Sequence, residues 1–74
     1  MPDAAKGLEV NGRVLEQMAN ALYRVELENE GRSQVTAHVS GGSAGILRVL
    51  PGDGVVVELM PYDMTRGRIV RRRS

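Results

Sequence analysis

The strongest constraint on the fold is a set of short segments in which apolar and polar residues alternate. In the first segment, residues 8–14, Leu8, Val10 and Val14 share one face and charged or amide side chains take the other. A period of two is that of a half-buried β-strand. The same alternation returns in 22–27 and 35–39, and it predicts strands there as well.

Two more strands are expected in the second half of the chain, at 55–60 and 66–72. Gly12 interrupts the first strand and predicts a bend or bulge. Turn chemistry marks the connections. We expect turns at residues 18–21, at 28–33 with Gly31 able to take a positive φ, at Pro51–Gly52 as a type II turn, and at 61–63.

Between the third and fourth strands lies the glycine-rich segment 41–45, followed by 46–50, which is compatible with one or two helical turns. Five short strands with a helical or irregular insert at this place predict an all-β protein, a five-stranded OB-fold Greek-key barrel. An SH3-like barrel is the alternative. We expect residues 8–73 to form this one domain and residues 1–7 to be a flexible tail.

Several classes of protein fit the composition poorly. The chain has no cysteine and one histidine, so thiolate chemistry and a two-histidine metal site within one chain are excluded. The glycine-rich segment lacks the lysine of a phosphate-binding loop. No apolar run approaches the roughly 20 residues of a membrane span. We expect a monomeric cytoplasmic protein with no catalytic residues, no metal ion and no cofactor.

Charge is divided unevenly along the chain. Residues 1–63 carry five basic against nine acidic side chains, a balance of −4, whereas residues 64–74 carry five arginines and no acid. A concentrated basic end favours an anionic partner such as nucleic acid. Simple alternation puts Arg66, Arg68 and Arg72 on one face of the last strand, with Arg71 and Arg73 on the other. A solvated basic tail is the plain alternative.

Other polar side chains are placed to support nucleic-acid binding. Thr36, His38 and Ser40 share the polar face of the third strand and can line a groove that contacts phosphates and 2′-hydroxyl groups. A surface histidine with a local hydrogen bond is the simpler reading of His38. Tyr23 has the parity of a core residue. Tyr62 is compatible with either capping the barrel or stacking on a base.

Several blocks of the sequence together resemble bacterial translation initiation factor one. The blocks are VELEN at 25–29, TAHVSG at 36–41, RVLPGD at 48–53, VEL at 57–59 and PYDMTRGRIV at 61–70. The resemblance implies an OB barrel without catalytic activity. It also implies binding to 16S rRNA at the A site of the small ribosomal subunit, together with the other two initiation factors. The residues that it implicates in rRNA contact are Arg24, Thr36, His38, Ser40, Gly41, Arg48, Tyr62, Arg66, Gly67, Arg68 and Arg71.

Two segments depart from the family pattern. Residues 42–47 are neutral where the family usually carries a basic stretch, and the turn at 30–34 is longer than usual. Two other functions therefore stay open. One is a general RNA chaperone of the cold-shock or S1-like kind, for which two tyrosines are few. The other is an OB module whose groove binds a protein partner.

Overall fold

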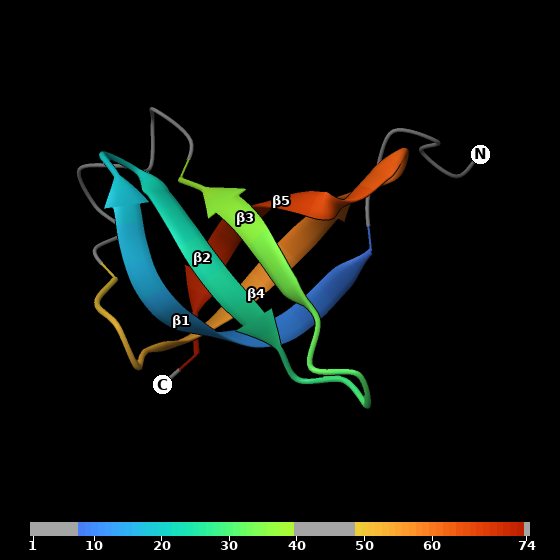
Figure 1. The fold of residues 1–74 in the computed structure, drawn as a ribbon, viewed down its shortest axis with the longest axis horizontal. Helices are drawn as coiled ribbons and strands as arrows, with labels where there is room; N and C mark the ends of the chain where they lie inside the picture. Colours follow the sequence, from blue (N-terminus) through green and yellow to red (C-terminus); the bar gives the residue numbers. More distant parts are fainter. Residues whose placement is uncertain (1–7, 40–48, 74) are drawn as a thin grey trace.

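A computed structural model describes residues 8–39 and 49–73 of the chain (Figure 1). Five strands run through these residues: β1 (Glu9–Ala19), β2 (Leu22–Leu27), β3 (Gln34–His38), β4 (Gly54–Met60) and β5 (Asp63–Arg72). The expected N-terminal tail, 1–7, and most of the expected helical insert lie outside the described residues. Within the described ranges there is no helix, and so none long and apolar enough to cross a membrane.

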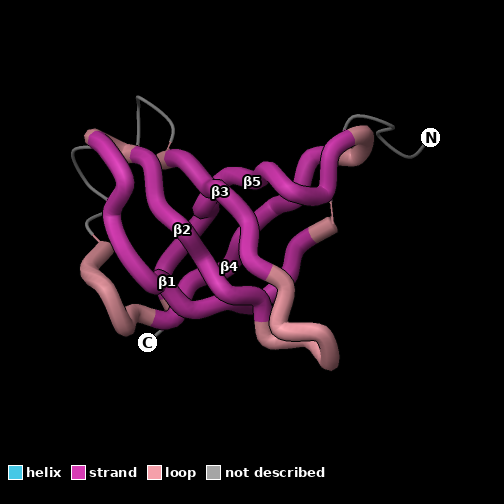
Figure 2. Tube along the Cα trace, in the orientation of Figure 1, coloured by secondary structure: helices cyan, strands magenta, loops and turns pink. Residues whose placement is uncertain are grey.

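The strands form a closed barrel in the order β1-β2-β3-β5-β4 (Figures 1 and 2). Its neighbouring strands are antiparallel except β3 and β5, which run parallel over three residue pairs. β1 closes the barrel because it pairs with β2 on one side and with β4 on the other. This order is that of the OB-type Greek-key barrel, and it confirms the predicted fold.

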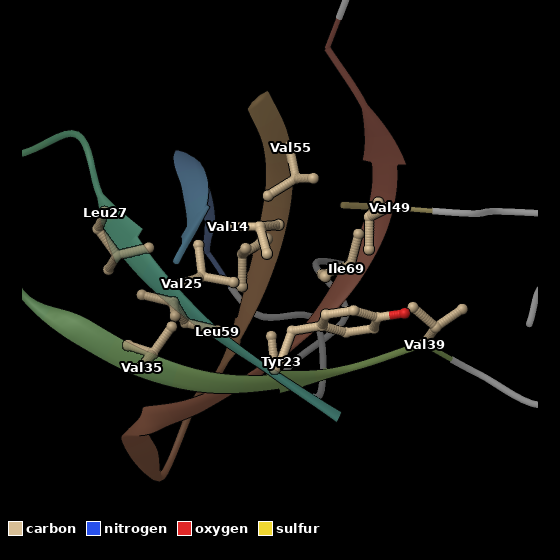
Figure 3. Close-up of a cluster of buried hydrophobic side chains, with 12 residues drawn as sticks. Val14, Tyr23, Val25, Leu27, Val35, Val39, Val49, Val55, Leu59 and Ile69 are labelled. Carbon is tan, nitrogen blue, oxygen red and sulfur yellow. The ribbon is translucent and has the colours of Figure 1, made fainter. Parts of the chain in front are cut away.

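The core is built from the inward-facing residues of all five strands (Figure 3). Val25, Ala37, Val55 and Val57 have no exposed area. Tyr23 belongs to the same cluster, as its parity predicted. The buried cluster comprises Val14, Tyr23, Val25, Leu27, Val35, Ala37, Val39, Val49, Val55, Val57, Leu59 and Ile69.

Gly12 lies in a regularly paired part of β1, so the bulge that the sequence allowed at this position is absent, and the glycine is needed for close packing. A Cβ at Gly12 would lie 2.6 Å from a methyl carbon of Val25 and 3.0 Å from the carbonyl oxygen of Glu26. The irregularities of β1 fall later, where Leu15 and Met18 are extra residues opposite β2. They extend β1 to Ala19, so the first turn is shorter than expected.

The other turns follow their residue chemistry with one exception. Gly52 has a φ of 95°, and the Asp53 amide donates to the Leu50 carbonyl at 3.0 Å, as a type II turn requires. In the turn after β2, the positive φ of 48° belongs to Arg32 and not to Gly31. An asparagine side chain supports that turn, because the Ser33 amide donates to Asn29 Oδ1 at 3.1 Å.

β5 is longer than predicted and carries a bulge that changes the expected arginine faces. Val57 pairs with Ile69 but Val56 pairs with Arg71, so Val70 is an extra residue. Cross-strand partners share a face, and Arg72 consequently lies opposite the inward Val55. Arg71, not Arg72, shares the outer face of β5 with Arg68. Simple alternation failed here because a bulge reverses parity.

We predict that replacing Gly67 with alanine destabilises the barrel by roughly 1–3 kcal/mol. Its Cβ would lie 2.6 Å from a Val57 methyl and 2.9 Å from the Glu58 carbonyl oxygen, a backbone atom that moves little. Urea denaturation measures the loss. Gly31→Ala is the matched control, since the nearest atom to its Cβ is 3.8 Å away. Equal effects of the two changes would contradict this packing account.

An exposed ion pair ties the end of β5 to the end of β2, and it predicts a pH effect. Arg73 Nη1 donates to Glu28 Oε1 at 2.9 Å, and this hydrogen bond lowers the pKa of Glu28 from its ordinary 4.5. A lowered carboxyl pKa stabilises the fold above the unfolded-state pKa, and that contribution is lost as pH falls through the folded-state pKa.

We therefore expect an NMR titration of the Glu28 carboxyl carbon to give a midpoint below 4.5, and Arg73→Gln to raise it. The free energy of unfolding should fall as pH drops below about 4.5, with a smaller fall in the variant. An unchanged Glu28 midpoint in Arg73→Gln would show that this pair does not set the pKa.

Candidate nucleic-acid interface

Two rows of side chains cross the outer face of the barrel from β2 through β3 to β5. In the first row Arg24 pairs with Thr36, and Thr36 pairs with Arg66. In the second row His38 lies between Leu22 and Arg68. Residues far apart in the sequence thus form one surface, because the parallel contact of β3 and β5 aligns them.

A groove of about 700 Å³ opens on this face. It lies where β2 and β5 begin, beside the middle of β3 and the end of β4. Its lining comprises Leu22, Thr36, His38, Met60, Tyr62, Asp63, Arg66 and Gly67. The groove therefore offers apolar surface, hydroxyl and imidazole groups and a guanidinium side by side.

Tyr62 lies in the two-residue turn between β4 and β5, and its side chain is 88% exposed. Of the two sequence interpretations, capping the barrel is therefore wrong, because a capping ring would be buried. An exposed ring at the edge of a groove keeps a face available for stacking on a planar group.

At the start of β5, the Asp63 side chain accepts two hydrogen bonds from Thr65. Its Oδ1 accepts hydrogen bonds from the Thr65 hydroxyl at 2.6 Å and from the Thr65 amide at 3.1 Å. These hydrogen bonds lower the pKa of Asp63 from its ordinary 3.8, and the positive charge of Arg66 adds to the effect. A fixed negative charge thus lies in the groove beside Arg66.

The three described arginines of the interface are each paired with a carboxylate, a feature that the linear sequence did not predict. Arg24 Nε lies 2.9 Å from Glu16, and Arg68 Nη2 lies 2.5 Å from Glu58, which is largely buried. The Arg66–Asp63 pair is looser, at 3.9 Å, and Arg66 is 75% exposed. The basic end of the chain is therefore partly neutralised by acids from other strands.

The structure brings together seven of the eleven residues predicted to contact rRNA: Arg24, Thr36, His38, Tyr62, Arg66, Gly67 and Arg68. Gly67 contributes backbone only, since its missing side chain would point inward at Val57. Arg71 lies farther along β5 and pairs with Glu9 at 3.5 Å across β4. Ser40, Gly41 and Arg48 lie outside the described residues.

Sequence reasoning missed three residues of the groove: Leu22, Met60 and Asp63. Leu22 has the outward parity of Arg24, which was a usable signal. Met60 and Asp63 are paired with each other next to a register shift, and parity does not predict such a position. Within 8–39 and 49–73, no three His, Asp or Glu side chains lie close enough to hold a metal ion.

No family model matches the chain, but solved structures do. The barrel is similar to translation initiation factor one from the Wolbachia endosymbiont strain TRS of Brugia malayi. The TM-score is 0.69 and the identity 38%, over 90% of this chain and 78% of that one.

It is also similar to part of YjeQ from Thermotoga maritima, with a TM-score of 0.70 and 24% identity. That match covers 90% of this chain but only 23% of YjeQ, and at this identity it indicates the fold alone. The identity and coverage of the first match, together with the barrel order, show that the chain belongs to the family of translation initiation factor one.

Proposed function

We propose that this protein acts in translation initiation by binding 16S rRNA at the A site of the small ribosomal subunit, alongside the other two initiation factors. The observation that carries the proposal is the outer face of β2, β3 and β5, where three arginines and the groove lie together. Family membership supports the same role. No bond is made or broken in it, and the protein acts by occupying its site.

Phosphate contacts supply most of the affinity in this mechanism. The planar fork of arginine gives a phosphate two hydrogen bonds as well as a charge. An incoming phosphate competes with the carboxylate that each guanidinium already contacts. Arg66 exchanges most readily because its contact with Asp63 is long and its side chain is the most exposed of the three.

Arg68, unlike Arg66, has mainly a structural role in this proposal. Its short contact with the largely buried Glu58 stabilises the outer face of β4 and β5. Removing the guanidinium would leave that carboxylate in a less favourable environment. We infer that Arg68 positions the strand surface and contributes less than Arg66 to phosphate binding.

The remaining groove residues suit the nucleoside parts of RNA. Tyr62 provides an exposed ring for stacking on a base, which is worth about 1–3 kcal/mol per base. Thr36 and His38 face the same groove from β3 and can hydrogen-bond to ribose 2′-hydroxyl groups, which distinguish RNA from DNA.

Arg66→Ala should weaken binding to vacant small subunits about ten-fold and reduce the salt slope of log affinity by about 1, with the fold intact. Arg68→Ala should weaken binding less and cost about 1 kcal/mol of stability, a fall of about 5 °C in thermal midpoint. Co-sedimentation at several salt concentrations measures the effect of each variant on binding, and thermal unfolding measures its effect on stability. The ranking of Arg66 and Arg68 fails if Arg68→Ala binds more weakly than Arg66→Ala at unchanged stability.

The role itself is tested by co-sedimentation of the protein with vacant small subunits at low and near-physiological salt. We expect saturable one-to-one binding that an established initiation factor one competes away. If about four phosphates are contacted, log affinity falls against log salt with a slope near −3. An absence of binding at both salt concentrations would contradict the ribosomal role and turn attention to other RNA or to a protein partner.

A further inference from the structure

A second, smaller pocket lies at the other end of β2. Its volume is about 360 Å³ and its lining comprises Arg13, Glu26, Leu27, Glu28, Asn29 and Arg32. Arg13 comes from β1 and pairs with Glu26 of β2, so both side chains are on the outer face. This pocket shares no residue with the groove.

Arg13 is available for a ligand. None of the ion pairs among the described residues involves Arg13. Its side chain also makes no hydrogen bond to another described residue. An arginine that lines a pocket without an ion pair can bind an anion without first giving up a carboxylate.

Arg32 is held at the same pocket by its turn. Its amide donates to the Asn29 carbonyl at 3.1 Å, and its φ of 48° is one that arginine rarely adopts. The Arg32 side chain is 78% exposed. Its Nη1 lies 3.9 Å from Glu26 Oε1, which is long for an ion pair. The backbone thus presents a second exchangeable guanidinium beside Arg13.

Glu28, which lines the same pocket, is influenced by several arginines. It accepts a hydrogen bond from Arg73, and Arg73, Arg13 and Arg32 all act to lower its pKa. Arginines from β1, from the turn after β2 and from the position after β5 thus act on one exposed carboxylate, which shares the pocket lining with a second carboxylate, Glu26. Such a carboxylate occupies the place that a phosphate oxygen would prefer.

The groove and the pocket are joined by the outer face of β2. Leu22 begins the strand at the groove, Arg24 follows two residues later, and Glu26 reaches the pocket. At about 3.3 Å per residue, the path from Leu22 to Leu27 is about 16 Å long. Arg24 lies midway and offers a guanidinium between the two ends.

We propose that the pocket of Arg13 and Arg32 binds a backbone phosphate of the same RNA strand that occupies the groove, after that strand has passed Arg24. The inference rests on the proposed RNA-binding role and adds to it a second phosphate site and a path along β2 for the bound strand. Arg13 supplies a forked donor directly, and Arg32 supplies a second one by exchanging its loose contact with Glu26.

The test compares two single-stranded RNAs, one of about four nucleotides that fills the groove and one of about ten that reaches the pocket, within the span of OB-type sites. Arg13→Gln should weaken binding of the longer RNA about three- to ten-fold and leave the shorter unaffected, as measured by fluorescence anisotropy. Circular dichroism checks the fold. Arg72→Gln, which removes the same charge outside both pockets, should lower neither affinity by more than about two-fold.

If Arg13→Gln weakened the affinity for both RNAs equally, the effect would be one of net charge and the second site would be overturned. The same holds if Arg13→Gln and Arg72→Gln weakened the affinity for the longer RNA equally. Binding of inorganic tripolyphosphate as tight as that of the longer RNA would overturn it in favour of a free polyanion. Arg66→Gln tests the groove separately, because it should weaken the binding of both RNAs. If Arg66→Gln changes neither while Arg13→Gln still affects only the longer RNA, the second site stands and the groove assignment fails.

Discussion

The parallel contact between β3 and β5 is the constraint on which the rest of the structure depends. Only three residue pairs make it, yet it joins β5 to the β1-β2-β3 part of the barrel and brings Thr36 and His38 beside Arg66 and Arg68. At its centre Gly67 faces Ala37, with Val57 and Leu59 behind it. Two small residues allow the strands to approach over a filled core. The same packing that stabilises the fold therefore creates the candidate interface.

In the proposed function, carboxylates of the protein compete with phosphates of the RNA for the arginines of this face. The outer face is rich in arginine, but Glu9, Glu16, Glu58 and Asp63 hold the guanidinium groups in place while no ligand is bound. The exposed pairs contribute little stability and exchange easily, so they orient Arg24, Arg66 and Arg71 without blocking them, whereas the largely buried Glu58 holds Arg68 more firmly. The proposal therefore implies selectivity for a partner whose phosphates are spaced to replace several of these carboxylates at once.

Much of the fold was predictable, because period-two alternation identified the first three strands and Tyr23 as a core residue, and a valine-rich run indicated the strand at 55–60. The resemblance to the initiation factor family identified most of the groove. What failed was local: a bulge at Val70 reversed the faces of Arg71 and Arg72, and the extra residues Leu15 and Met18 lengthened β1. Bulges depend on the partner strand, which linear periodicity does not include. The pairing of Arg66 and Arg68 with acidic side chains was likewise not predictable from the sequence, because it depends on turn geometry and strand register.

A photo-crosslinking side chain in place of Tyr62 tests most directly whether this face contacts rRNA. Tyr62 is exposed at the groove, whereas Met18 on β1 is also exposed but lines neither pocket. With small ribosomal subunits, the account predicts crosslinks from position 62 to nucleotides of the 16S A site and far fewer from position 18. Crosslinks from position 18 to that region, with none from position 62, would contradict the assignment of the β2–β3–β5 face as the RNA-binding surface.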